Sequence, residues 1–480
     1  MNSNRPSDAS PRDSAVPSRV PWKLGVVAML AFVAAQPGAG HVPSPAPGAG
    51  IGAAPAAAPA TLFLDVRIFD GRRAELSAPS NVLVQGNVIE RISTAPIAAE
   101  PGTTVIPAAG RVLMPGLSDV HWHAMLVRTT PTAALTDDVG YTNLQAGVEA
   151  TATLMRGFTT VRDMGGPSFA LKRAIDEGLL PGPRIYPSGA MITVTSGHGD
   201  FRQRSELPRS LGGPPSRIEQ IGGSAIADSP DEVRLRVREQ LMKGATQIKL
   251  TAGGGVASPF SPLDVSTFTQ DELHAAVEAA ENWGTYVCTH AYTPASIRLS
   301  IAAGVKCIEH GHLMDDATAR LMAQKGIWLS TQPFLDLGGA AALGPAQQGK
   351  MREVVSGTDR VYALARKYGI KTAFGTDILF SAALAERQGA LLADLTHWFT
   401  PAEALIMATS TNAQLLALSG LRNPYPGRLG VVEEGALADL LLVDGDPLRD
   451  IRLVADPGKN FLIIMKDGVI YKNTVPGSGR

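Results

Sequence analysis

Short apolar runs alternate with amphipathic stretches from about residue 112 to residue 413. Apolar runs bounded by turn residues are typical of strands that are buried on both faces, as in a parallel sheet. The runs occur at residues 117–123, 159–164, 184–189, 246–251, 286–291, 306–310, 328–331 and 372–377. Strands that alternate with helices predict an α/β fold, here a (β/α)8 TIM barrel over residues 116–413.

Three of the amphipathic stretches carry clear boundary signals. Residues 269–284, 293–304 and 315–326 have apolar residues at helical spacing, and each ends at a glycine, which favours the left-handed conformation that terminates helices. Thr269 is followed by Glu272 three residues later, which is the pattern of a capping box. We predict a helix in each stretch.

The flanks of the barrel show a different pattern, in which short apolar strands are separated by turns. Residues 61–115 contain TLFLDVRIFDG and NVLVQGNVIERIS, and residues 414–475 contain ADLLLVDGDPLRDI and NFLIIMKDGVIYKN. Neither flank is large enough to bury both faces of its own strands. We therefore expect the two flanks to pair into one small β-sandwich. A long polar insertion at residues 195–235 follows the third barrel strand, where substrate loops of such barrels lie.

The N-terminus has the pattern of an export signal. A polar segment with several basic residues precedes the apolar run LGVVAMLAFVAA at residues 24–35, which is too short to span a bilayer comfortably. We predict a signal peptide over residues 1–35, cleaved after Ala35 or Ala39, and a periplasmic or secreted protein. Residues 36–60 are rich in Pro, Ala and Gly, which predicts a disordered linker. An uncleaved N-terminus that tethers the protein to a membrane is the alternative.

Charge and cysteine content narrow the classes of partner. The 480-residue chain has 43 Lys and Arg against 44 Asp and Glu, and no polybasic run, so we expect no nucleic-acid partner. The two cysteines, Cys288 and Cys307, both lie in apolar runs, and we interpret them as buried thiols. Neighbouring strands could still bring them together, and export would permit a disulfide.

Two histidines stand one residue apart at the end of the first barrel strand, in LMPGLSDVHWHAM. On a strand, His121 and His123 point to one face and Trp122 to the other. Neutral imidazole is a common zinc ligand, so both rings could bind one ion. A pair of histidines without a metal is the alternative. Asp119 shares the histidine face and is a candidate for orienting a ligand ring.

The other barrel strands favour a metal site, because several of them carry a potential ligand near the carboxyl end, where the active sites of such barrels lie. These residues are Lys249 in TQIKLTAGGG, His290 in TYVCTH, His310 in VKCIEH and Asp377 in KTAFGTD. A lone buried lysine is costly, since its charge needs a partner or must be lost. Reaction with carbon dioxide would turn Lys249 into an anionic carbamate that can bridge two ions. The two histidines of the first strand and these four residues together predict a site for two divalent metal ions, with Zn²⁺ as the first candidate.

Over nearly all of residues 61–475, the chain resembles members of the amidohydrolase superfamily that have a binuclear metal site. The resemblance rests on PGLSDVHWH, on the four strand-end residues above and on the closing segment GVVEEGALADLLLVDGDPLRDI. It implies that His121, His123 and Asp377 hold one ion, that His290 and His310 hold the other, and that carbamylated Lys249 bridges them. It also implies that Asp377 is the general base that takes a proton from a bridging water or hydroxide.

Four further stretches resemble the Xaa-Pro dipeptidase-like and imidazolonepropionase-like subgroup: TTVRDMGG, SGHGDFR, IKLTAGGGVASP and CIEHGHLMDD. Members of this subgroup cleave dipeptides or N-acyl amino acids, and some hydrolyse ochratoxin A to release phenylalanine. The bridging Lys249 argues against true imidazolonepropionases and deaminases, which lack it. The resemblance thus implies a hydrolase of a small amide or peptide substrate, and we expect a homo-oligomer.

Two other classes of function are compatible with parts of this pattern. A cyclic-amide hydrolase of the hydantoinase or dihydroorotase type uses the same six ligand residues on the same barrel. A non-catalytic interaction protein of this fold is disfavoured, because such relatives have lost ligands and all six are present here. Ring opening without cleavage of linear amides would identify the cyclic-amide class.

Several residues near the strand ends are candidates for substrate contacts. His198 in the polar insertion is a candidate for both catalysis and substrate binding, and Arg202 suits a substrate carboxylate. Tyr292, His312 and Val256 are further candidates for substrate binding. Apolar residues of the same loops predict a pocket for an apolar or aromatic side chain, namely Phe260, Phe334 and Leu379. We interpret Arg162 as part of a structural ion pair, and the three glycines at 253–255 as a loop that lets substrate approach the backbone.

Overall fold

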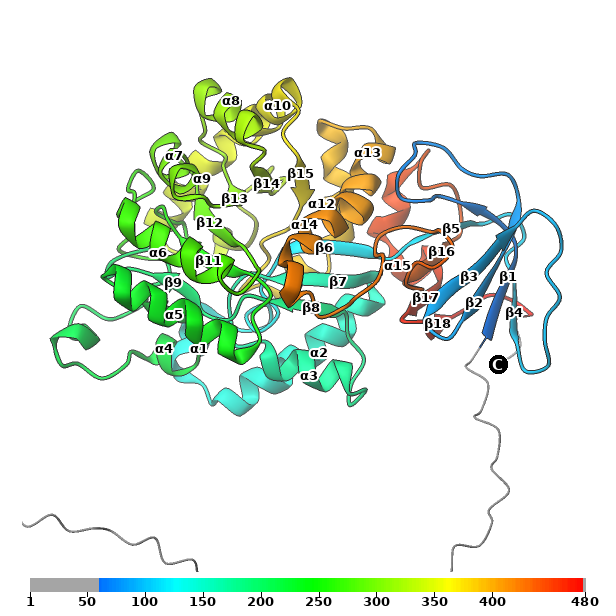
Figure 1. Ribbon diagram of the computed structural model, residues 1–480, viewed down its shortest axis with the longest axis horizontal. Helices are drawn as coiled ribbons and strands as arrows, with labels where there is room; N and C mark the ends of the chain where they lie inside the picture. Colours follow the sequence, from blue (N-terminus) through cyan, green and yellow to red (C-terminus); the bar gives the residue numbers. More distant parts are fainter. Residues whose placement is uncertain (1–59, 478–480) are drawn as a thin grey trace, which may run out of the picture. The chain divides into compact units, whose positions relative to one another are not determined.

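A computed structural model of the protein describes residues 60–477. The predicted signal peptide and all but the last residue of the predicted linker lie outside this range. Figure 1 shows parallel strands of a barrel surrounded by helices, together with a sheet built from the first and last strands of the described chain.

The barrel contains all eight strands that the apolar runs predict. They are β6 (Leu117–Trp122), β7 (Phe158–Asp163), β8 (Arg184–Pro187), β11 (Ile248–Thr251), β12 (Val287–Ala291), β13 (Cys307–His310), β14 (Trp328–Thr331) and β15 (Thr372–Phe374). Neighbouring strands pair in parallel from β6 to β8 and from β11 to β15, and a parallel bridge between Trp122 and Ile378 joins the last strand region to the first. The predicted α/β TIM barrel is confirmed.

The third strand region differs from the prediction. It continues past Gly189, which has a φ of +73°, into a second strand, β9 (Met191–Thr193), and β9 rather than β8 pairs with β11. The polar insertion then adds the parallel strand β10 (Ser224–Ile226) beside β9. Both strands are only three residues long, so neither produces a recognisable apolar run in the sequence.

Helices cover the outside of the barrel (Figure 1). The α-helices of the described residues are α1 (Pro131–Thr136), α2 (Val139–Met155), α3 (Phe169–Asp176), α4 (Arg217–Gln220), α5 (Pro230–Lys243), α6 (Gln270–Glu281), α7 (Pro294–Ala303), α8 (Asp316–Lys325), α9 (Pro345–Ser356), α10 (Thr358–Tyr368), α11 (Ala382–Ala385), α12 (Gln388–Asp394), α13 (Pro401–Ile406), α14 (Asn412–Leu416) and, beside the flanking sheet, α15 (Pro457–Asn460). The three predicted helices are confirmed as α6, α7 and α8, and Thr269 and Glu272 form the predicted capping box.

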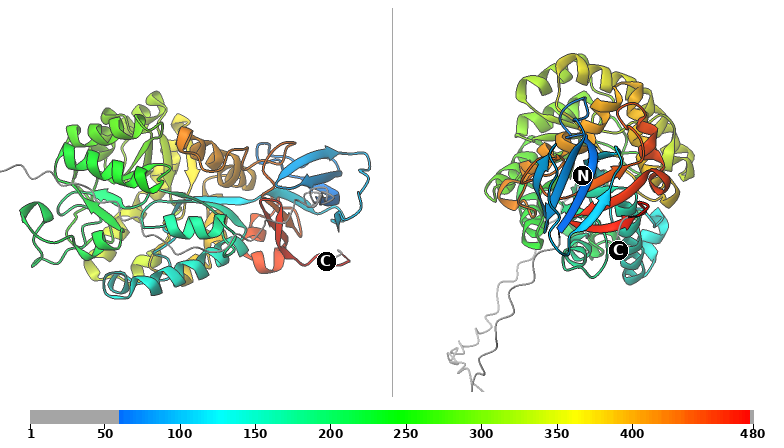
Figure 2. Two further views of the ribbon diagram at one scale, coloured as in Figure 1. Left: turned by 60° about the horizontal axis from the view of Figure 1, so that its bottom comes forward. Right: turned by 90° about the vertical axis from the view of Figure 1, so that its right-hand side faces the viewer.

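The two flanks form one continuous mixed sheet. Its strands are β1 (Ala60–Ile68), β2 (Ser80–Gln85), β3 (Val88–Ser93), β4 (Thr104–Pro107), β5 (Val112–Pro115), β16 (Leu440–Val443), β17 (Phe461–Lys466) and β18 (Val469–Asn473). The order is β18-β17-β16-β5-β1-β2-β3, with β4 paired to β1, so strands from both ends of the chain lie side by side (Figure 2). The pairing of the flanks is therefore confirmed.

The expected sandwich arises because this single sheet bends at β1. The register of β1 against β2 shifts between Phe63 and Val66, and Asp65 in the interruption has a φ of +55°. Side chains from both arms then form one buried cluster, in which Val82 and Ile89 of one arm share a core with Leu442 and other residues of the second arm. Because of the bend, the two arms of the one sheet face each other and bury the side chains between them, as the two sheets of a sandwich do.

A buried ion pair fastens the flanking sheet to the barrel. Arg184 of β8 donates to both carboxylate oxygens of Asp439, at 2.9 and 3.1 Å, and to Asp467 at 2.7 Å.

The helical stretch from Pro401 to Arg422 crosses residue 413, where we placed the end of the barrel. It is long and apolar enough to span a membrane, but Leu405, which it contains, is fully buried in the barrel core, as expected for a core helix.

The two cysteines occupy directly opposed positions on adjacent barrel strands. Cys288 of β12 is in register with Cys307 of β13. Both are free and fully buried, which confirms their interpretation as buried thiols. Burial raises the pKa of the Cys288 thiol to about 12, so this group stays protonated near neutral pH.

Candidate metal centre

Six candidate ligands lie at the carboxyl ends of the barrel strands. His121 belongs to β6 and His123 follows it, Lys249 belongs to β11, His290 to β12 and His310 to β13, and Asp377 follows β15. The lysine and all four histidines are buried, and the Asp377 side chain is 18 % exposed. The parallel strands point the same way, so their ends converge on one edge of the barrel.

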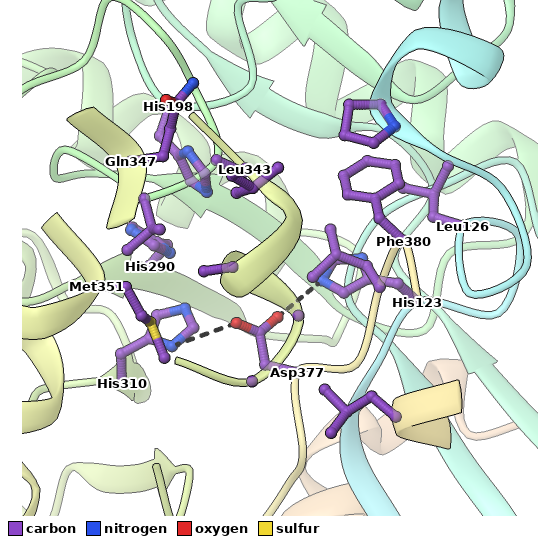
Figure 3. A pocket seen from close by; sticks show the side chains of 18 of the residues that line it. His123, Leu126, His198, His290, His310, Leu343, Gln347, Met351, Asp377 and Phe380 are labelled. Atoms are coloured by element: carbon purple, nitrogen blue, oxygen red, sulfur yellow. Dashed lines mark ion pairs between the residues drawn. The ribbon is translucent and has the colours of Figure 1, made fainter. Parts of the chain in front are cut away.

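Asp377 lies at the centre of this cluster (Figure 3). Its Oδ1 lies 3.3 Å from Nε2 of His121 and 3.2 Å from Nε2 of His123, and its Oδ2 lies 3.9 Å from Nδ1 of His310. Potential ligand atoms of His121, His310 and Asp377 all lie within 4.8 Å of one another, close enough to share one ion.

Lys249 and His290 complete the cluster. Nζ of Lys249 lies 3.4 Å from Nε2 of His121. The rings of His290 and His310 lie 4.3 Å apart between centroids. The structure therefore brings together all six residues that the sequence proposes as ligands.

Each of the four imidazoles has one ring nitrogen in contact with a protein acceptor. These contacts are His121 Nδ1 with Glu309 at 2.9 Å, His123 Nδ1 with Gly165 O at 3.1 Å, His290 Nε2 with Gly254 O at 2.9 Å and His310 Nδ1 with Gln332 Oε1 at 2.7 Å. Metal-binding histidines characteristically donate one N–H in this way and present the other nitrogen to the metal. The donor set therefore fits a divalent metal ion.

The electrostatics of the cluster favour neutral imidazoles. Burial, reinforced by Lys249 and the neighbouring histidines, lowers the pKa values of His121, His290 and His310 well below the usual range. Neutral imidazole is the form that binds metals. Asp377 and His310 also have positive φ angles of 54° and 77°, an uncommon conformation that Asp and His adopt more readily than most residues.

Glu309, which sequence reasoning missed, is the residue that orients His121. One of its carboxylate oxygens contacts His121 Nδ1, and the other accepts from Arg162 at 2.7 Å and from the Cys307 thiol at 3.2 Å. Arg162 and Glu309 are both fully buried, which confirms the structural ion pair predicted for Arg162. The sequence signal was a glutamate inside the apolar run VKCIEH, directly before a ligand.

We expect Glu309→Gln to destabilise the protein by about 3–5 kcal/mol, because it leaves the buried Arg162 charge without its counterion. Urea unfolding followed by circular dichroism measures this change. Glu353→Gln, at an exposed position of α9, is the matched control and should change stability by less than about 0.5 kcal/mol. Equal stability of the two variants would show that Arg162 does not depend on Glu309.

Asp119 has a different role from the one expected. Its carboxylate accepts from the backbone N–H of His121, from both the N–H and the hydroxyl of Thr376, and from Gln388, and it does not contact an imidazole. These bonds tie β6 to the segment that carries Asp377. Burial raises the Asp119 pKa to about 6.

A cavity of about 670 Å³ opens above the cluster. Its wall includes the candidate substrate residues His198, Tyr292 and Val256, and the apolar residues Phe260, Phe334 and Leu379. The His198 ring lies 4.3 Å from the His290 ring, and the Tyr292 ring lies 5.0 Å from that of His310. Substrate that enters the cavity would reach the metal ligands between these groups.

The hydrogen bonds of Ser258 determine which nitrogen of His198 carries the proton. The buried Ser258 hydroxyl accepts from the Gly199 N–H at 2.8 Å and lies 2.9 Å from His198 Nδ1. The hydroxyl proton needs an acceptor, and Nδ1 is the one within reach. Burial, Lys249 and Lys350 lower the pKa of His198 to about 3, which favours the neutral ring, and a Ser258 hydroxyl that donates to Nδ1 leaves the ring proton on Nε2.

Two candidate substrate residues are engaged elsewhere. Arg202 lines the cavity, but its guanidinium forms a bidentate pair with Asp200, at 2.9 and 2.7 Å, and also donates to Thr195. These bonds use Nε and Nη2, so a substrate carboxylate could be bound only through Nη1. His312 is buried outside the cavity wall, where it stacks on Phe334.

The three glycines at 253–255 serve loop packing rather than substrate approach. A Cβ at Gly254 would lie 1.5 Å from the carbonyl oxygen of Pro262, and a Cβ at Gly255 would lie 2.1 Å from Nδ1 of His198. The loop folds back on itself and lies directly against His198. We refer to residues 252–263 as the glycine loop.

Comparison with known proteins agrees with this geometry. The model of the amidohydrolase family matches residues 112–471, which include the whole barrel and the closing strands. The chain belongs to the amidohydrolase family. It is a metal-dependent enzyme that acts on carbon–nitrogen bonds, with His121, His310 and Asp377 in its metal site.

Three relatives of this amidohydrolase are particularly similar. Ochratoxinase of Aspergillus niger is 32% identical over 386 residues, which cover 77% of each chain, and its crystal structure covers 88% of this chain and 97% of its own with a TM-score of 0.75. A prolidase complexed with N-methylphosphonate-L-proline is 33% identical, with a TM-score of 0.80 and coverage of 86% and 100%. A Xaa-Pro dipeptidase with bound methionine is 27% identical, with a TM-score of 0.75 and the same coverage.

Proposed function

We propose that this amidohydrolase cleaves the amide bond of a dipeptide or an N-acyl amino acid and releases the free amino acid. The observation that carries the proposal is a largely apolar cavity of about 670 Å³ placed directly over the candidate metal ligands. The names of the similar proteins support it, since they are an ochratoxinase, a prolidase and a Xaa-Pro dipeptidase. Ochratoxin A, which contains phenylalanine, is one candidate substrate.

We further propose that the site holds two divalent ions, with zinc as the first candidate, and that Lys249 carries a carbamate. His121, His123 and Asp377 would hold one ion, His290 and His310 the other, and Lys249 both. Burial lowers the Lys249 pKa, and the neutral amine is the form that reacts with carbon dioxide. When bound, such ions lower the pKa of water and polarise a carbonyl oxygen.

Asp377 is the group placed to move the proton. Its carboxylate is the most exposed member of the ion-paired cluster, at 18 %, while the side chains of His121, His123 and His310 are at most 4 % exposed. It can accept a proton from the attacking water and return it to the leaving amine, which is the work of a general base and acid.

His198 and Tyr292 are placed to hold the substrate carbonyl oxygen. The contacts of Ser258 support a neutral His198 whose Nε2 proton is available to donate. Burial raises the Tyr292 pKa well above its usual range, so its hydroxyl remains a donor. Both groups would act as fixed donors toward charge that develops on that oxygen. Val256 and the aromatic residues of the cavity wall would contact the substrate side chain.

A panel of substrates tests the proposal. Purified protein with zinc is incubated with N-acyl and dipeptidyl phenylalanine compounds, Xaa-Pro dipeptides, ochratoxin A, a hydantoin and dihydrouracil, and chromatography follows free amino acids and the N-carbamoyl amino acids that ring opening would give. We expect release of amino acid from linear amides and no ring opening. Ring opening alone would identify the protein as the cyclic-amide alternative, which uses the same ligands.

Export and self-association remain parts of the proposal. The predicted signal segment supports a periplasmic or secreted location, which fractionation of the source cells can test. Exposed apolar residues on one face of α2, Tyr141, Leu144 and Val148, support a homo-oligomer. Light scattering on the purified protein measures its mass in solution.

A further inference from the structure

Lys350, on helix α9, donates three hydrogen bonds to the glycine loop. Its Nζ lies 2.7 Å from the carbonyl oxygen of Gly255, 2.8 Å from that of Ser258 and 3.0 Å from that of Ser261. An ammonium group has three donors, so all of them are used. Within residues 60–477, no carboxylate forms an ion pair with Lys350. The side chain therefore joins α9 to the glycine loop, and its hydrogen bonds within the described part of the chain all go to that loop.

The glycine loop in turn orients two imidazoles of the site. Gly254 O accepts from His290 Nε2 at 2.9 Å, which leaves Nδ1 of that ring available to a metal. Ser258 Oγ contacts His198 Nδ1 at 2.9 Å, which leaves Nε2–H to face substrate. Both contacts come from a loop without regular secondary structure, so hydrogen bonds from outside the loop are needed to hold its backbone in place.

The fit between loop and rings tolerates little movement. Gly255 approaches His198 so closely that a Cβ would lie 2.1 Å from Nδ1. Helix α9 also contributes Gln347 and Met351 to the cavity wall. The bonds of Lys350 thus connect two walls of one cavity, and Lys350 itself does not line it.

We infer that Lys350 is a positioning residue for hydrolysis, which holds the glycine loop so that Gly254 and Ser258 fix the rings of His290 and His198. This inference rests on the proposed roles of those two histidines. Lys350 contacts neither of them directly in hydrogen bonds, and acts through three backbone carbonyls. Loss of these bonds should loosen the loop and misalign both rings.

The test compares Lys350→Ala with the wild-type protein, both loaded with zinc. We expect faster hydrogen–deuterium exchange across residues 252–263 and faster loss of zinc to a chelator. With a linear amide that the wild type cleaves, kcat should fall about 10–100-fold, the usual cost of removing a supporting residue around a metal site. Because Val256 and Phe260 of the glycine loop line the cavity, KM should rise together with the fall in kcat. Propylammonium should restore part of kcat, and propanol should not, because only the ammonium supplies the missing donors.

Two further variants serve as a substitute for the alanine variant and as a control. Lys350→Met keeps the length of the side chain and replaces the alanine variant if the latter does not fold. Arg352→Met removes an exposed cation from the same helix and should behave as the wild type. Unchanged exchange over 252–263 in both Lys350 variants, or equal effects in Arg352→Met, would overturn the inference. If the wild type cleaves no linear amide, the proposed function fails, while exchange and zinc retention still decide the role of Lys350.

Discussion

Lys249→Ala should lose both metal and turnover. Lys249 is buried within β11, and its Nζ lies 3.4 Å from a ring nitrogen of His121, among the other candidate ligands. If its carbamate is the anion shared by two ions, alanine removes a ligand from each of them. The ions contribute several kcal/mol to the transition state, so turnover should fall about 10³-fold or more. Metal analysis after gel filtration and amide-cleavage assays measure the two effects.

Lys466→Ala separates the metal site from the general effect of removing a buried lysine. Lys466 lies in β17 of the flanking sheet, is 6 % exposed, and donates to the carbonyl oxygen of Gly182 at 3.0 Å. This control should lose stability but keep its metal. Full metal content and activity in Lys249→Ala would show that the lysine is not a bridge.

Asp377→Asn should keep the fold and lose turnover by about 10²–10⁴-fold, the usual contribution of general acid–base catalysis. Asparagine matches aspartate in shape but cannot accept the proton. It also tolerates the positive φ of 54° at this position, whereas alanine would add backbone strain. Steady-state kinetics together with metal analysis distinguish a lost proton acceptor from a lost ion.

Asp65→Asn is the matched control, because Asp65 has nearly the same backbone angle, with a φ of 55°, and is exposed in the flanking sheet. It should leave turnover unchanged. Near-native turnover of Asp377→Asn with both metals bound would refute the catalytic role of Asp377.

Most of the barrel follows from local patterns in the sequence. Each apolar run is long enough for one strand, and several end at a polar residue where the chain leaves the core, as at His310 and Asp377. Because parallel strands share a direction, their carboxyl ends meet on one edge of the barrel, and the sequence alone groups the six candidate ligands there. Helix ends at Gly304 and Gly326 follow equally from local conformational preference.

The contacts around the ligands required the tertiary structure. Glu309 and Arg162 lie 147 residues apart in the chain, and nothing local to either one indicates that they neutralise each other. Arg202 looked free for a carboxylate, but the fold of its own loop pairs it with Asp200. The Lys350 contacts likewise join segments about ninety residues apart.

The sequence by itself thus determined the barrel, the pairing of its flanks and the identity of the candidate ligands, because strand alternation and strand ends are local properties of the chain. Only the tertiary structure decided which ring nitrogen each histidine leaves free and which cations are already paired. It also decided how the glycine loop is held against His198. Those features depend on side chains and carbonyls that meet from distant segments, and hydrogen-bond geometry at a few tenths of an ångström is not encoded in any local pattern.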